Sequence, residues 1–173
     1  MSQNKVQQVV ESLTNLRLSV ARRVPDMRVF HFGQMRQGNG GTMGQYALHI
    51  QCPWRIDGPE GIVTGRSDLW EHISGKRMPD EWEPSIDDNI QDIQIGYLLG
   101  SYNTETHSHV NSSALLVVER VRASDIGDLD INLSGGYRLI LFPSGRIGEA
   151  WRLFEPGKDT PHFVIEGSGS YFV

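Results

Sequence analysis

The sequence has 173 residues, and 16 lysines and arginines stand against 21 aspartates and glutamates, giving a formal net charge of −5. This length, with 38% hydrophobic and 21% charged residues, indicates one globular domain over residues 1–173 and excludes a disordered chain. No apolar run reaches the ~18–20 residues that a transmembrane helix needs. The first residues also lack the apolar core of a secretory signal. Because Cys52 is the only cysteine, an intrachain disulfide and a cysteine-based zinc cage are excluded, and we expect a cytoplasmic protein.

The charges are unevenly distributed. Residues 1–36 carry six positive side chains against two acidic ones, whereas residues 57–105 carry three against eleven. The chain has no block of lysine and arginine of the kind that binds nucleic acid, and no basic strand interleaved with aromatic residues. We therefore expect a protein partner, with a basic protein as a candidate, and we expect neither nucleic acid nor a membrane.

One helix is predicted at the start of the chain. Apolar residues recur there at spacings of three and four, which places them on one helical face: Val6, Val9, Val10 and Leu13. The spacing predicts a helix over about residues 3–14, with Ser2 as its cap.

Alternating polarity then predicts strands at residues 16–20, 27–32 and 46–52, followed by a hairpin with arms at 54–56 and 62–64. Between them, residues 37–44 are rich in glycine. The spacing of the glycines departs from the phosphate-binding pattern, and the segment leads into a strand instead of a helix. We therefore interpret these residues as a flexible hairpin loop.

Residues 66–113 form an irregular acidic segment. Residues 86–99 fit a helix, although Ile93, Ile95 and Tyr97 also match a strand. Long irregular stretches in small domains are usually functional or mobile, so we expect this segment to form the rim of any site.

Residues 114–173 are predicted to form a β-meander. A continuous apolar run at 114–118 favours a central strand that continues to residue 122. Further alternating segments follow at 129–133, 137–142, 149–155 and 163–166, separated by glycine and proline turns. The fold class is α+β and mostly β: a curled antiparallel sheet, either a barrel or a sandwich, with the N-terminal helix packed on it.

Histidines raise the possibility of a metal site. His107 and His109 are two residues apart, so both rings would point the same way in an extended strand, and His49 or Glu119 would supply a third ligand. The alternative is a pair of solvent-exposed histidines in a polar loop, and we expect no bound cofactor.

An acidic run is the candidate surface for a partner. It comprises Asp80, Glu81, Glu83, Asp87 and Asp88, and only two basic residues lie nearby. Such a field steers a basic protein toward the surface; the alternative is an ordinary solvated loop.

A small-molecule pocket is the second candidate, lined by Trp54, Arg55, Asp68 and Trp70. Residues 46–56 (YALHIQCPWRI), with GRSD at 65–68, resemble segments in an uncharacterised family of small bacterial proteins. The resemblance implies a bacterial source and no catalytic residue.

Three functions therefore stay open. We favour a non-enzymatic cytoplasmic protein-binding module, similar to an immunity or accessory protein. The alternatives are a small-ligand-binding β-barrel and a metal-dependent enzyme that uses His107 and His109. Because an antiparallel sheet has open edges, we also expect a homodimer rather than a monomer.

Overall fold

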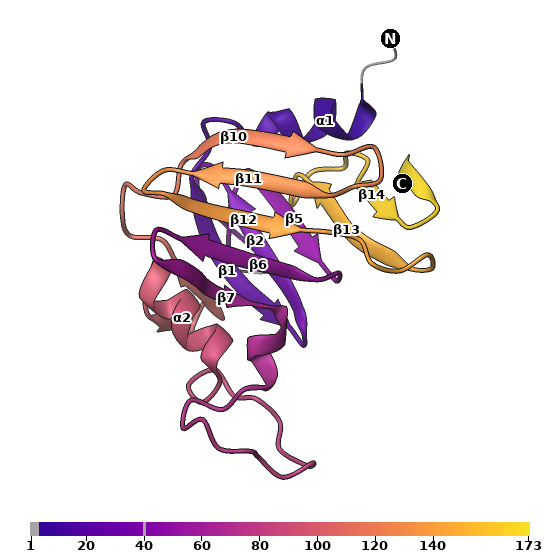
Figure 1. Ribbon diagram of the computed structural model, residues 1–173. Coiled ribbons are helices and arrows are strands. Elements are labelled where there is room, and N and C mark those ends of the chain that lie inside the picture. The colour runs from indigo at the N-terminus through magenta and orange to yellow at the C-terminus, as the bar shows by residue number, and fades with distance from the viewer. Residues whose placement is uncertain (1–3, 40) are drawn as a thin grey trace.

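The computed structural model describes residues 4–39 and 41–173, and two antiparallel sheets dominate it (Figure 1). The larger sheet has eight strands in the order β15 (Gly169–Phe172), β14 (Phe163–Glu166), β13 (Glu149–Phe154), β5 (Tyr46–Ile50), β2 (Met27–Phe32), β1 (Leu18–Val24), β9 (Ser108–Val110) and β8 (Tyr102–Asn103). The smaller sheet has five strands in the order β10 (Val118–Ala123), β11 (Leu129–Leu133), β12 (Tyr137–Leu141), β6 (Trp54–Gly58) and β7 (Gly61–Gly65).

The core lies between these two sheets. Alternate residues of each strand point inward, so Phe30 and Trp151 of the larger sheet face Trp54 and Leu139 of the smaller one, and all four are buried. The rings of Phe30 and Trp54 meet edge to face at 5.6 Å. The predicted mostly-β fold with a sandwich-like sheet arrangement is confirmed. The barrel alternative is wrong, because within the described residues neither sheet closes on itself.

The two sheets are joined at one corner. The Leu18 amide donates to the carbonyl of Leu116 at 2.9 Å, and the Val118 amide donates to the carbonyl of Leu16 at 2.8 Å. The run at residues 114–118 is therefore not a central strand, as the sequence predicted. The backbone turns at Leu116, whose φ is 65°, to carry the chain between the sheets, and β10 begins only at Val118.

The N-terminal helix α1 (Lys5–Val10) continues as a 3₁₀ turn, Glu11–Leu13, and buries Val6, Val10 and Leu13 as predicted. The predicted cap, Ser2, lies outside the described residues; the Asn4 side chain accepts a hydrogen bond from the Gln7 amide instead. Gln7 also covers the outer edge of β10: its side-chain amide donates to the Val121 carbonyl, and its side-chain oxygen accepts from the Ala123 amide. This contact satisfies polar groups of an edge strand that would otherwise be open to another chain.

Strands β3 (Arg36–Gly38) and β4 (Gly41–Met43) pair antiparallel in a short hairpin, as the glycine-rich pattern predicted; residue 40 of that pattern lies outside the described residues. It is pinned to the larger sheet by the Gly44 amide, which donates to Nδ1 of His31 at 3.0 Å, and by the Arg22 guanidinium, which donates to the Thr42 carbonyl.

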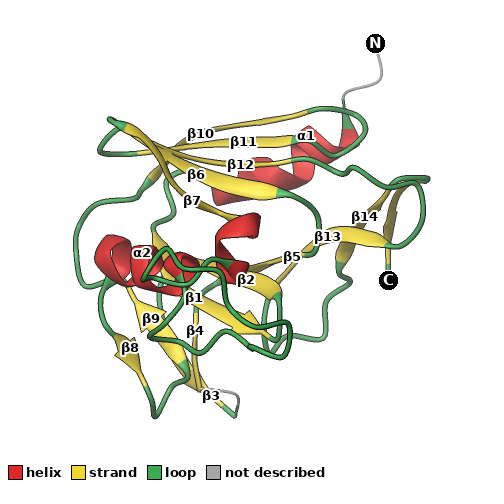
Figure 2. Cartoon of the chain, turned by 60° about the horizontal axis from the view of Figure 1, so that its bottom comes forward, coloured by secondary structure: helices red, strands yellow, loops and turns green. Residues whose placement is uncertain are grey.

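The irregular segment contains more structure than the sequence indicated. A 3₁₀ turn, Arg66–Trp70, follows β7, and helix α2 (Ile90–Leu99) begins after the Asn89 cap. The predicted helix at 86–99 is thus confirmed from residue 90 onward, and the strand alternative is wrong. Helix α2 lies across one end of the sandwich and contacts β7 of one sheet and β1 and β9 of the other (Figure 2). In the described part of the chain, no helix has the length and hydropathy to cross a membrane.

Candidate functional site

A surface pocket of about 570 Å³ lies where β6, β7 and the 3₁₀ turn meet. Its walls include all four residues that the sequence put forward for ligand binding: Trp54, Arg55, Asp68 and Trp70. We call it the Trp70 pocket. That these four residues meet follows from the β6–β7 hairpin, which returns the chain to Trp54 just before the 3₁₀ turn begins.

Three large apolar side chains of the Trp70 pocket are open to solvent. Trp70 is 59% exposed, Ile62 is 69% exposed and Phe142 is 45% exposed. Single exposed apolar residues are common on protein surfaces, but several that gather around one depression are typical of an interaction site.

Two of the four predicted residues support the pocket rather than present groups to a ligand. Trp54 is buried against Phe30. The Asp68 carboxylate accepts hydrogen bonds from the Thr64 hydroxyl at 2.9 Å and from the Gly65 amide at 3.1 Å, which fixes the start of the 3₁₀ turn. Of the four predicted residues, Arg55 and Trp70 therefore stay candidates for direct contact with a ligand.

The positive charges at the pocket rim are already balanced. Arg55 is paired with Asp57 at 2.8 Å. Arg66 donates to the Gln51 carbonyl and lies 3.7 Å from the Asp26 carboxylate. The pocket is consequently apolar inside and nearly neutral at its rim.

Directly after Trp70 comes a protruding segment, residues 71–89, which we call the acidic loop (Figure 1). It carries six acidic side chains against Lys76 and Arg77. Its two ends are paired, since the Ile73 amide donates to the Asp88 carbonyl at 2.8 Å and the Ile90 amide donates to the Glu71 carbonyl at 2.9 Å. A compact surface loop with closed ends is a form that frequently carries function.

The acidic loop is also packed internally. The Trp82 ring meets His72 at 5.6 Å, and its indole N–H donates to the Asp88 carboxylate at 3.3 Å. Asp88 additionally accepts from the Ser85 amide, and Asp87 accepts from the Ser85 hydroxyl. These contacts explain why a segment without regular secondary structure keeps a defined shape.

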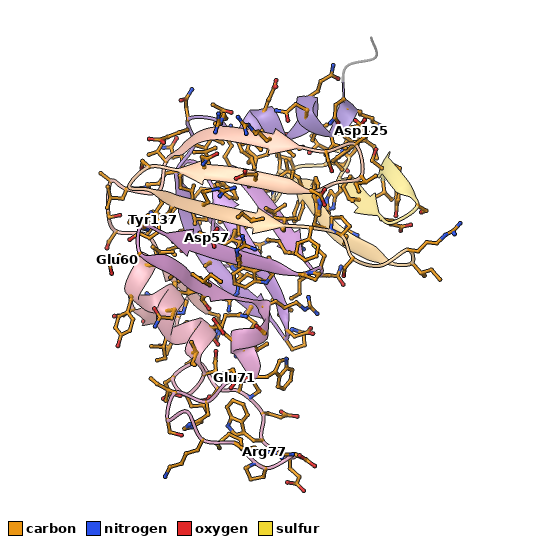
Figure 3. The ribbon with its side chains drawn as sticks, in the orientation of Figure 1. Asp57, Glu60, Glu71, Arg77, Asp125 and Tyr137 are labelled. Carbon is orange, nitrogen blue, oxygen red and sulfur yellow. The ribbon has the colours of Figure 1, made fainter. Side chains whose placement is uncertain are left out.

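The five residues predicted to bind a partner fall into two groups. Asp87 and Asp88 hold the loop together, as described above. In the described part of the chain, Asp80, Glu81 and Glu83 are exposed and make neither a hydrogen bond nor an ion pair. In Figure 3, Arg77 marks the far end of the loop and Glu71 its base, so the loop extends well away from the sandwich.

A buried charge network fastens the base of the loop to the larger sheet. Asp92, in the first turn of α2, pairs with Arg28 at 2.8 Å and with Arg23 at 3.0 Å, and the Asn89 side chain donates to it at 2.8 Å. Burial alone would raise the pKa of Asp92, but the two guanidinium groups and the hydrogen bonds lower it below its usual value. Burial lowers the pKa of Arg28, an effect that Asp92 opposes.

The sequence offered little signal for this network. Arg28 sits at an inward-facing strand position, and Asp92 looks like one more residue of the acidic run, 64 positions away. Arg28 also donates to the Gln91 side chain at 3.1 Å, so two successive polar residues of α2 contact one arginine.

The structure does not bring the three metal-candidate histidines together. His107 has a φ of 49° and precedes β9, so the alternation that would align it with His109 does not apply. His109 is buried against Gly96 of α2 and bonds the Gly100 carbonyl through Nδ1 at 2.8 Å. His49 is separated from β9 by two strands and packs on Phe154. Over residues 4–39 and 41–173, no three side chains of metal-ligating type form a cluster.

Three other reactive side chains, Cys52, His31 and His49, are buried or half-buried. Burial raises the pKa of the Cys52 thiol to about 11, which disfavours the nucleophilic thiolate. Burial and the nearby Arg22 lower the pKa of His31 to about 3, and burial and Arg152 lower that of His49 to about 4. Both imidazoles are therefore neutral at pH 7.

Comparison with protein families, with curated proteins and with solved structures found no match to this chain.

Proposed function

We propose that the protein is a non-enzymatic cytoplasmic binding module, similar in kind to an immunity or accessory protein, that recognises a basic partner protein through the acidic loop. The observation that carries the proposal is the contrast within this loop. Its backbone and its tryptophan are fixed by internal contacts, while Asp80, Glu81 and Glu83 have no hydrogen-bond or ion-pair partner among the described residues.

This contrast supports binding on energetic grounds. Neighbouring like charges repel one another, and a protruding loop loses conformational entropy when it is held in one shape. A shaped loop with unpaired carboxylates loses less entropy on binding than a mobile one, and its field accelerates the encounter with a positively charged surface.

Selection from a displayed random-peptide library, with the full chain as bait, tests the proposal. We expect the enriched peptides to be rich in lysine and arginine, and their affinity, measured by fluorescence anisotropy, to fall as the salt concentration rises. Neutralising the loop with Asp80→Asn, Glu81→Gln and Glu83→Gln together should weaken binding by at least roughly tenfold.

A matched control removes three other exposed acids, by Glu60→Gln, Glu119→Gln and Asp125→Asn. Glu60 and Asp125 lie far from the loop tip in Figure 3. Both triple variants have the same net charge, so equal loss of binding in the two would reduce the effect to overall charge and contradict the proposal. Enrichment of peptides without basic residues would contradict it as well.

A further inference from the structure

The Trp70 pocket and the acidic loop are consecutive in the chain and adjacent in space. Trp70 ends the 3₁₀ turn that lines the pocket, and Glu71 is the first residue of the loop. The backbone amide of Ile90, the first residue of α2, donates to the Glu71 carbonyl at 2.9 Å. This hydrogen bond fixes the point where the pocket meets the loop. A partner that binds the loop therefore passes close to the pocket.

We propose that the Trp70 pocket receives one uncharged aromatic or branched aliphatic side chain of the same partner, so that the partner presents an apolar anchor next to a cluster of lysine or arginine residues. This inference rests on the proposed function and names the chemistry of the recognised segment.

The pocket's chemistry selects an apolar anchor. Its exposed walls are Ile62, Trp70 and Phe142, and the one carboxylate in its lining, Asp68, is already engaged by Thr64 and Gly65. A lysine placed here would lose water and find no free carboxylate, whereas an aromatic ring would bury apolar surface at about 25 cal/mol per Å².

The charges around the pocket also favour an apolar group in the pocket and basic groups over the acidic loop. Arg55 and Arg66 line the pocket and are already paired with acidic side chains, so a cationic group finds no free carboxylate there. Within the described residues, the exposed carboxylates of Asp80, Glu81 and Glu83 lie further along the loop. Apolar and acidic recognition are thus separated in space, and one flexible or extended segment can satisfy both.

The pocket is rigid enough to act as an anchor site. The Gln91 side chain of α2 donates to the carbonyls of Gly65 at 2.9 Å and of Arg66 at 3.2 Å, which ties the 3₁₀ turn to the helix. A tryptophan beside arginines in a preformed depression is the composition in which binding energy concentrates at protein interfaces.

Three probes test the inference on the full chain: N-acetyltryptophanamide, a pentalysine peptide, and the two joined by glycine–serine linkers of two to eight residues, whose mean spans are roughly 8–16 Å. We expect N-acetyltryptophanamide to shift the Trp70 indole N–H resonance, and pentalysine to shift amides between residues 80 and 88. At the best linker length the joined probe should bind at least roughly tenfold more tightly than pentalysine.

Variants then identify the residues that make the joined probe bind more tightly than pentalysine. Trp70→Ala and, independently, Phe142→Ser should remove the advantage of the joined probe and leave pentalysine affinity unchanged. Tyr97→Ala, which removes an 80%-exposed aromatic ring on α2, is the control that should keep the advantage. Circular dichroism confirms that each variant is folded.

The outcomes separate the two proposals. If the joined probe binds no better than pentalysine, or if its advantage survives in both pocket variants, the inference fails while the acidic loop remains the binding site. If N-acetyltryptophanamide binds the pocket but joining it to pentalysine adds nothing, the pocket is an independent small-molecule site, which also overturns the inference. If pentalysine binds equally well to the loop-neutralised triple variant, the proposed function itself fails.

Discussion

Replacing Asp92 by Asn tests whether the buried network holds α2 and the acidic loop in place. Asp92 is fully buried and compensates two guanidinium groups, one of them, Arg28, itself only 1% exposed. Asn has nearly the same shape but cannot balance the charges. Removing one member of a buried ion pair costs about 3–5 kcal/mol.

Since 1 kcal/mol moves the melting temperature of a domain of this size by about 2–4 °C, we expect Asp92→Asn to lower it by roughly 10 °C. Calorimetry or urea unfolding measures the change. Hydrogen exchange at the Ile73 and Ile90 amides, which close the loop base, should accelerate in parallel.

The matched control is Asp130→Asn. Asp130 pairs with Arg138 at 2.7 Å, but both side chains are partly exposed, so this pair contributes less than about 1 kcal/mol. If Asp92→Asn costs no more than Asp130→Asn, the buried network does not anchor α2, and the explanation for the fixed shape of the loop is refuted.

Three further predictions concern the sheets. Because the pKa of His31 falls from 6.5 to about 3 on folding, the unfolded chain binds the proton that the folded one excludes, and stability should decline as the pH drops from 6.5 toward 3. His31→Asn keeps an acceptor for the Gly44 amide but does not titrate in this range. If the stability of this variant falls with pH as steeply as that of the wild type, His31 is not the cause of the decline. Gln7→Ala should cost about 1–2 kcal/mol in urea unfolding and accelerate exchange of the Ala123 amide; unchanged exchange would mean that Gln7 does not cover the β10 edge. Deleting residues 171–173, which extend β15 along β14, should lower the melting temperature and leave the mass by light scattering unchanged, whereas a halved mass would show that the tail holds a homodimer.

Local patterns predicted those elements whose causes are local. The spacing of Val6, Val10 and Leu13 defined one face of α1, and the alternation of Leu129, Ile131 and Leu133 placed β11 with its buried side correctly. Asp130, on the opposite face of β11, pairs with Arg138.

Contacts between residues far apart in the sequence could not be predicted from local patterns. Nothing near Leu116 indicates that its run is a corner between sheets, because the reason is pairing with residues 16–18, about a hundred positions earlier. The pairing of Arg28 with Asp92 has the same origin.

The four pocket residues were chosen for their chemical types, and the structure brings them together. It also gives Asp68 and Trp54 supporting positions that their types do not predict. For the acidic run, composition predicted a charged surface. The fixed shape of that surface depends on Trp82 and on the paired loop ends.

Mapping amide and indole chemical shifts of the full chain, titrated with the tightest basic peptide from the library selection, tests the central claim most directly. We predict that the largest shifts lie at residues 80–88 and at the Trp70 indole, and that they diminish as salt is added. Shifts centred on another face, such as the surface around His49 and Phe154 on the outer side of β5 and β13, would contradict it.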